Sequence, residues 1–500
     1  MQIDFQEERI RCLEERVTEI LYQEETAEVI VPDVYPDAAA VAEVSVICCV
    51  RDQEVRQGAI NVSGTFQATV LFTAEESGEV CVQDVWLPFA VRLSDEQIPA
   101  DGVGRAEVRV RLADARILNS RKLLVRISYG ARLSVFAPST LCSRSCEQSG
   151  GVQLLRTQVS HYTALCVAEK TMDFSDTLQL PAMESPVSRV ARVRPTLRMR
   201  EQKLKEGRAV CHGVLDLSIL CLLETGQLSH CNLQLPVSQY LDLEGEPEEG
   251  TLRVLSSLTE FRLEEDASGA YLLTVGVRLQ VMVWGTVSVS LFEDGYCIGK
   301  TFTAVQEPIE LRRCLGEPQT VSTAEIQLRG EASRPLDAAV WVDFPVCRRT
   351  TDDIAAGAVA TATALYYDAA GVLRGETGKT EISCKFPVDS AAVCYADAEC
   401  DGETLFRGNG PISHDVQFRV SCMELRQKQM IVSAETGSDE VLQDNMPSLT
   451  VRRLQKGERL WDAAKRNGTT VRAVCLANGL ESEEAPEGML LLIPAYSEDA

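Results

Sequence analysis

The stretch that decides the fold is GAINVSGTFQATVLF, residues 58–72. A second glycine-led run, GRAVCHGVLDLSILCL, starts at Gly207, and a third, GAVATATALYY, starts at Gly357. A period of two with β-branched and aromatic residues is typical of a half-buried β-strand, so the sequence predicts a mainly β protein. In the first run, the residues that would share the buried face are Ile60, Val62, Gly64, Phe66, Ala68, Val70 and Phe72.

A proline-led stretch precedes each glycine-led run. Its prolines, Pro36, Pro186 and Pro335, lie 22, 21 and 22 residues before the glycines. Three agreeing spacings indicate three tandem copies of one unit, each large enough to have its own core, and we expect antiparallel β-sandwich-like units. Because proline is favoured at the first position of a helix, we also expect a short helix in each copy. The copies occupy residues 1–148, 149–299 and, in a divergent form, 300–436.

The start of the chain has two interpretations. RIRCLEERVTEILYQEE, residues 9–25, places Ile10, Leu13 and Val17 at helical spacing. The corresponding stretch of the second copy, TALCVAEKTMDF, residues 163–174, has the pattern of a strand. Since equivalent segments of a repeat should fold alike, we expect an extended start. The alternative is an amphipathic helix that docks onto a partner.

Composition restricts the class of partner and the compartment. The 500 residues include 49 Lys and Arg against 74 Asp and Glu, a net charge of −25, which argues against nucleic acid or an anionic membrane as the main partner. No window approaches the roughly 18 consecutive apolar residues of a membrane span. The first residues are charged and lack an apolar core, so we expect no secretory signal. In that setting the 18 cysteines are expected to be reduced thiols.

Motifs for chemistry are sparse in this sequence. It has no phosphate-binding GxxxxGK[ST] loop, no GxSxG nucleophile elbow and no HExxH metal motif. One group of cysteines and histidines could be considered as a metal site, but it contains two pairs of adjacent residues. Adjacent residues of a strand point to opposite faces of the sheet, so these side chains would not converge on a metal, and we expect buried free thiols there. The group consists of Cys211, His212, Cys221, His230 and Cys231. We expect no enzyme activity, no cofactor and no metal.

The C-terminal residues 448–496 follow a different plan, after a polar linker at 437–447. TVRRLQKGERLWDAAKRNGTTVRAVCLANGL, residues 450–480, followed by GMLLLIP, predicts a strand, two helices and a strand. Gly468 is a candidate left-handed cap of the first helix, Thr469 and Thr470 are candidate N-caps of the second, and Gly479 ends it. The residues expected in the core of this small domain are Trp461, Ala464 and Val474.

This C-terminal region resembles the LysM domain, which it matches in the glycine turn, the Leu-Trp-x-x-Ala helix, the Gly-Thr-Thr step and the closing Ile-Pro. In members that bind N-acetylglucosamine chains, the groove lies between the loop after the first strand and the loop after the second helix. Such members usually carry Asp and then Thr or Ser after the glycine, whereas this chain carries Glu458 and Arg459. The acidic residues of the second loop could equally form a docking surface or a solvated loop without a partner. By the resemblance, the groove residues are Gly457, Glu458, Arg459, Leu460, Asn478, Gly479, Leu480, Glu481, Glu483 and Glu484.

The whole chain resembles the spore coat morphogenetic proteins of anaerobic spore-forming Firmicutes, which combine SPOCS repeats with a LysM domain. IVPDVYPD, residues 30–37, carries this resemblance together with the LysM domain. The resemblance implies a non-enzymatic coat scaffold in the mother-cell cytoplasm, at the forespore surface. Its LysM domain would bind the stage IV sporulation ATPase of the coat basement layer, and other coat proteins would be further partners. The alternatives are a protein that binds peptidoglycan or N-acetylglucosamine at the cortex or cell wall, and a hydrolase with an unrecognised site.

Overall fold

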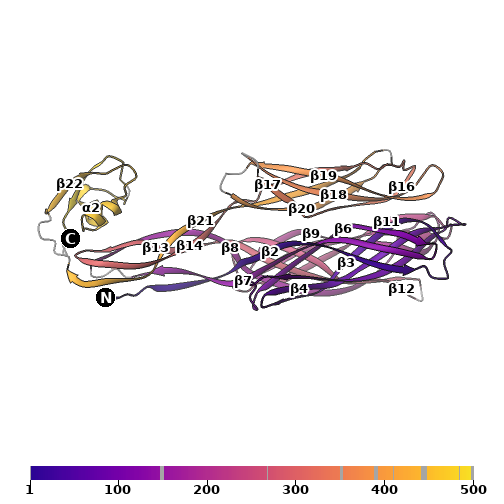
Figure 1. The fold of residues 1–500 in the computed structure, drawn as a ribbon, viewed down its shortest axis with the longest axis horizontal. Helices are drawn as coiled ribbons and strands as arrows, with labels where there is room; N and C mark the ends of the chain where they lie inside the picture. Colours follow the sequence, from indigo (N-terminus) through magenta and orange to yellow (C-terminus); the bar gives the residue numbers. More distant parts are fainter. Residues whose placement is uncertain are drawn as a thin grey trace.

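The structure is a computed structural model and describes residues 2–146, 151–266, 269–349, 353–387, 392–408, 410–440, 447–483 and 485–496. Within these residues it contains 23 strands and two helices, so the prediction of a mainly β protein is confirmed. Neither of these helices has the length and apolar content that a membrane crossing requires. Figure 1 shows an elongated molecule whose long strands run towards one end, where the small C-terminal domain and the N-terminus lie.

The first copy is built from two groups of three antiparallel strands. β4 lies between β3 and β5, and β7 lies between β2 and β6. The face of β4 predicted to be inward is buried, with Phe66 and Phe72 both fully enclosed. Phe66 stacks on Phe89 at 4.5 Å and meets the edge of Tyr129 at 4.9 Å. The strands are β2 (Gln6–Ile30), β3 (Ala38–Arg56), β4 (Ala59–Ala74), β5 (Val80–Ser94), β6 (Val103–Asn119) and β7 (Lys122–Ser145).

The second copy pairs its strands in the same order. β10 lies between β9 and β11, and β13 lies between β8 and β12. Single bridges from β3 to β12 and from β2 to β8 join the six strands of the first copy to β8, β12 and β13 of the second copy in one nine-stranded sheet, while β9, β10 and β11 form a separate sheet. The strands are β8 (Val152–Leu178), β9 (Val187–Lys205), β10 (Arg208–Leu223), β11 (Leu228–Asp242), β12 (Thr251–Glu265) and β13 (Tyr271–Cys297).

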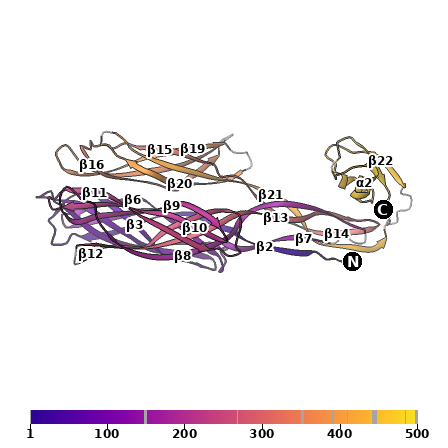
Figure 2. The same cartoon turned by 180° about the vertical axis from the view of Figure 1, so that it is seen from behind.

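The third copy keeps the order but splits two of its strands. β18 lies between β19 on one side and the two short strands β16 and β17 on the other, and β21 pairs with β14, β15 and β20. β1 (Gln2–Ile3) also pairs with β21. In Figures 1 and 2 the strands β16 to β20 form a layer alongside the first two copies. The strands are β14 (Lys300–Gly316), β15 (Gln319–Ile326), β16 (Arg334–Val342), β17 (Val346–Arg349), β18 (Asp353–Tyr367), β19 (Leu373–Pro387), β20 (Ala392–Leu405) and β21 (Ile412–Glu440).

The prediction of a short helix after each proline is wrong. Strand β3 starts two residues after Pro36, β9 starts one residue after Pro186, and Pro335 lies inside β16. Each of these strands pairs along the glycine-led strand of its copy, β4, β10 or β18. Proline also fits the entrance of a strand, and ladder pairing with the neighbour makes the extended state more stable than a helical turn.

The start of the chain is extended, as expected, and the helical alternative is wrong. β2 pairs with β7 over almost its whole length, with Gln6 opposite Ser145 and Ile30 opposite Lys122. The linker was predicted at 437–447, but its predicted start is too early, because β21 continues to Glu440. Residues 441–446 lie outside the described part of the chain.

Buried charges join the three copies. Arg192 of the second copy is fully enclosed and contacts Glu43 of the first copy at 3.2 Å and Asp337 of the third at 2.6 Å. Arg194 contacts the same two carboxylates at 2.9 and 3.1 Å. Burial alone would raise the pKa of Asp337, but Arg194 and Arg192 hold that pKa well below its usual range. The copies therefore meet through ionised groups that are largely buried.

Candidate functional site

The C-terminal domain has the strand, helix, helix, strand order that the sequence predicts, and its two strands form an antiparallel sheet. Thr470 caps the second helix by accepting a hydrogen bond from the Ala473 amide at 3.0 Å, and Gly479 ends it with φ of 65°. Leu491 and Ile493 point inward and are buried. The elements are β22 (Leu449–Arg453), α1 (Leu460–Arg466), α2 (Val471–Asn478) and β23 (Leu490–Pro494).

Glu458, which the resemblance places in the groove, is bound inside the domain. Its carboxylate accepts hydrogen bonds from Arg452 at 2.8 Å, Arg466 at 2.9 Å and the Gln455 amide at 3.0 Å. Its side chain is 7% exposed. The Gln455 amide, with further help from the Arg452 and Arg466 cations, lowers the pKa of Glu458. Glu458 therefore stabilises the turn and leaves little oxygen for a ligand.

The other residues of the first loop also have internal roles. The Arg459 amide donates to Asp462 at 3.0 Å and closes a capping box at the start of α1, while the Arg459 side chain stays exposed. Leu460 is buried, and Gly457 has φ of 77°, which the turn requires. Of the four groove residues in this loop, Arg459 is thus the one that presents a long side chain to solvent.

The second loop is fixed at its start and open further on. The Asn478 side chain accepts from the Leu492 amide at 2.8 Å and donates to the carbonyls of Leu492 and Val474 at 2.7 Å each. Leu480 packs against the core of the domain. Glu481 and Glu483 are exposed, and Glu484 lies outside the described residues. The expected groove therefore holds few free polar groups of the kind that orient a sugar.

Trp461, Ala464 and Val474 are buried, and Trp461 reaches beyond its own domain. Its indole N–H donates to Asp294 near the end of β13 at 2.9 Å, and its ring meets Tyr296 edge-on at 5.0 Å. Lys465 binds the same carboxylate at 2.7 Å, and the Tyr296 hydroxyl donates to the carbonyl of Thr469 at 2.6 Å. The sequence had marked the stretch around Asp294 only as a boundary between copies, with no signal of this contact.

A second feature absent from the sequence prediction is an apolar outer face on the two-stranded sheet. Val451 lies opposite Leu492, and these positions alternate with inward-pointing Leu491 and Ile493. We call this surface the outer face; its four members are Leu449, Val451, Leu490 and Leu492, with exposed fractions of 48, 55, 58 and 38%. The run LLLI hides the alternation in the sequence, because every position is apolar. Isolated exposed apolar side chains are ordinary, whereas four adjacent ones make this face a candidate interaction surface.

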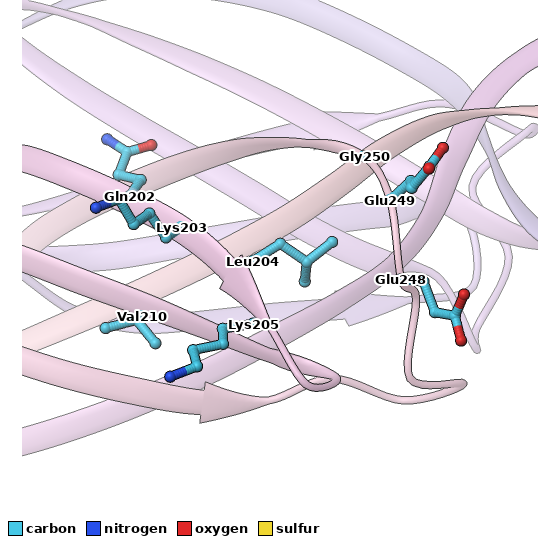
Figure 3. Close-up of a pocket in the computed structure, with 8 residues that line it drawn as sticks. All are labelled: Gln202, Lys203, Leu204, Lys205, Val210, Glu248, Glu249 and Gly250. Carbon is cyan, nitrogen blue, oxygen red and sulfur yellow. The ribbon is translucent and has the colours of Figure 1, made fainter.

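An open cavity of about 570 Å³ lies between the end of β9 and the turn before β12 (Figure 3). Lysines and glutamates share its rim, and its lining contains no histidine, cysteine or serine. The lining therefore carries no histidine, cysteine or serine side chain that could form a nucleophile and base pair or a nitrogen and sulfur metal ligand set. The lining residues are Gln202, Lys203, Leu204, Lys205, Val210, Glu248, Glu249 and Gly250.

The cysteine and histidine group singled out from the sequence does not converge. His212 contacts the Ser238 hydroxyl at 2.8 Å, whereas His230 contacts Ser218 at 3.0 Å. Cys211 and Cys221 are buried in two separate hydrophobic clusters. In the described part of the chain, no three His, Cys, Asp or Glu side chains are grouped to hold a metal ion.

We compared the chain with models of protein families and with curated proteins, and neither comparison gave a match. We therefore take the C-terminal domain as the candidate site on its own geometry. Its loops are occupied by internal contacts, its helix α1 is attached to the body of the molecule, and its outer face is open to solvent.

Proposed function

We propose that this protein is a non-enzymatic scaffold of spore coat assembly that acts at the forespore surface in the mother-cell cytoplasm. Its C-terminal domain would bind the stage IV sporulation ATPase of the coat basement layer, and the β body would carry other coat proteins. The resemblance to SPOCS and LysM proteins supplies the identity of this partner. The chain's own geometry supports one surface and an apolar kind of contact for this partner.

The observation that carries the proposal is the apolar outer face of β22 and β23. Val451 and Leu490 are each more than half exposed, although the same sheet buries its other side completely at Leu491 and Ile493. Removing apolar surface from water is worth roughly 25 cal/mol per Å², so covering this face with a folded protein would be favourable. Arg453, opposite Leu490, lies at the edge of the face and favours a partner with a carboxylate beside its apolar patch.

The expected glycan groove gives weaker support for the alternative ligand. A sugar needs hydrogen-bonding groups that are free to meet its hydroxyls. Glu458 and Asn478 are engaged with the domain's own backbone and cations. The exposed members, Arg459, Glu481 and Glu483, are long, charged side chains rather than a flat aromatic or amide platform.

The contact with β13 supports a role as a fixed docking head. Asp294 and Tyr296 hold α1 and the start of α2, so the domain has a defined orientation on the body. The outer face lies on the opposite side of the sheet from the helices and stays uncovered by this contact. A partner bound there would be attached to the end of the long strands (Figure 1).

The test is a binding measurement between the full-length chain and the purified ATPase. Val451→Glu combined with Leu492→Glu should abolish binding, because two charges would be buried against an apolar partner surface. The matched control is Val321→Glu on β15, since Val321 is 54% exposed and Val451 is 55% exposed. The control should bind as the unchanged chain does, and thermal unfolding should show that all variants are folded.

Two results would contradict the proposal. One is undiminished ATPase binding by the folded double variant. The other is tight binding of N-acetylglucosamine oligomers by the unchanged chain, lost on substitution of Arg459 and retained in the double variant, which would establish the glycan-binding alternative.

A further inference from the structure

Two cysteine thiols of the third copy lie against each other. Cys394 on β20 is directly opposite Cys422 on β21, and its thiol donates a hydrogen bond to the Cys422 sulfur at 3.5 Å. Both carry free thiols; Cys422 is buried and Cys394 is partly exposed. Neither residue takes part in the docking surface proposed above.

The backbone at this pair already has the spacing of a disulfide. Residues directly opposite on antiparallel strands have Cα atoms about 4.5–5.5 Å apart, which lies within the range that disulfides span. The sulfurs must approach to about 2 Å, and side-chain rotation can supply most of that change. No large movement of β20 or β21 is needed.

A second thiol pair shows how selective this geometry is. Cys221 and Cys231 also interact through a side-chain hydrogen bond, but Cys221 is opposite Ser229 and Cys231 is opposite Ile219. The two are therefore diagonal neighbours, with Cα atoms about 7–8 Å apart, beyond the limit for a bridge without backbone movement. Among the strand registers of the described residues, Cys394 and Cys422 are the one directly opposed pair of cysteines.

We propose that Cys394 and Cys422 are an oxidation site at which a peroxide forms a cross-strand disulfide between β20 and β21. The Cys394 sulfur attacks one peroxide oxygen, the O–O bond breaks, and the products are a sulfenic acid and water or an alcohol. The Cys422 sulfur then attacks the sulfenic sulfur, forms the S–S bond and releases water. Two thiols lose two electrons and two protons, and the peroxide accepts both.

The reaction is slow at neutral pH and faster in alkali. Burial raises the pKa of the Cys394 thiol, so the reactive thiolate is a minor species near neutrality. The product is a lasting bond within the sheet rather than a rapid sensor. The bond would join two residues that lie 28 positions apart in the sequence. Such a link restricts the unfolded state and would therefore stabilise the third copy.

The experiment treats the folded full-length chain with hydrogen peroxide, alkylates the remaining thiols and maps peptides without reduction. The expected product is a Cys394–Cys422 cross-linked peptide that forms before any other, with the mass of two hydrogen atoms lost. The unfolding temperature should rise by several degrees and return to its starting value on reduction. Raising the pH should speed the reaction.

Variants separate the specific pair from general thiol oxidation. Cys394→Ala should remove the cross-link and the rise in unfolding temperature, while Cys231→Ala, which breaks the diagonal pair, should leave both unchanged. The inference is overturned if the Cys221–Cys231 bridge forms first. It is equally overturned if Cys394 is recovered as sulfinic or sulfonic acid with Cys422 still reduced in the folded chain.

Discussion

The β body and the C-terminal domain use buried charge in different ways. In the body, Arg192 and Arg194 join carboxylates from two other copies at a largely buried site. In the domain, Asp294 of the body holds Trp461 and Lys465 through a carboxylate that is 32% exposed. One junction is internal and the other lies at the surface.

This difference assigns separate tasks to the two regions. Burying ions is costly unless every partner is present, so the junction of the three copies holds only in the complete fold. The partly solvated contact at Asp294 is weaker, and it fixes the orientation of the domain more than it contributes to global stability. The body is therefore a rigid support, and the domain is a head whose attachment can be altered separately.

The largest effect is expected from Arg192→Met, which breaks the internal junction. It leaves Glu43 and Asp337 buried with Arg194 as their remaining guanidinium, and should lower the free energy of unfolding by roughly 3–5 kcal/mol. Thermal or urea unfolding measures this loss. Arg116→Met, at an exposed position on β6, is the control and should change little. Equal stability of the two variants would mean that the junction does not hold the copies together.

Trp461→Ala is expected to have the next largest effect. It removes a buried ring from the domain core and from its contact with Tyr296, at a cost of about 3 kcal/mol to the domain. Limited proteolysis should then release the C-terminal domain while the body persists. Trp86→Ala, where the side chain is 61% exposed, should leave the digestion pattern unchanged. Resistance of the Trp461 variant to proteolysis would argue against this packing.

Acid should weaken the attachment of the domain through Asp294. Burial alone would raise the pKa of Asp294, but hydrogen bonds from Lys465 and Trp461 outweigh it and lower that pKa in the attached state. The stabilisation is therefore complete above the ordinary carboxyl pKa and is lost as the pH falls through the depressed value. Asp294→Ala should cost the attachment about 1 kcal/mol at neutral pH, given the exposure of the pair.

The acid effect can be followed by small-angle scattering, which reports a larger maximum dimension when the domain detaches. Asp294→Asn keeps an oxygen for the Trp461 N–H but cannot titrate, so it should show no step in acid. The same step in both proteins would assign the transition to another group.

The smallest effect is expected from charge reversal in the second loop. Glu481→Lys with Glu483→Lys alters two exposed side chains of the second loop. The unfolding temperature should stay unchanged, because isolated surface charges contribute little. A marked loss of ATPase binding by this folded variant would move the docking surface from the outer face to the loop.

Sequence patterns could predict features that depend on near neighbours along the chain. Alternation placed Phe66 and Phe72 inward on β4, and the order of elements in the C-terminal domain followed from its caps at Thr470 and Gly479. Proline was misread because Pro36 and Pro186 suit the entrance of a strand as well as that of a helix. Pairing partners decide between the two, and they lie far along the chain.

The site was harder to predict for the same reason. Trp461 was expected to be a core residue, yet its partner Asp294 lies 167 residues earlier in the chain. Glu458 looked like a groove residue because nothing in the sequence shows that Arg452 and Arg466 enclose it. The outer face could not be predicted because residues 490–493 are all apolar. Such a run shows no alternation that would tell which side chains point inward and which point outward.

The length of β21 has a mechanical consequence. Its 29 residues at about 3.4 Å each span roughly 100 Å, and the strand ends beside the C-terminal domain (Figure 1). A pull on that domain along the molecule would act parallel to β21 and perpendicular to its ladder hydrogen bonds with β14. Such a load is shared by many bonds at once, in shear, instead of opening them one after another. The molecule is thus built to resist tension along its long axis more than sideways peeling.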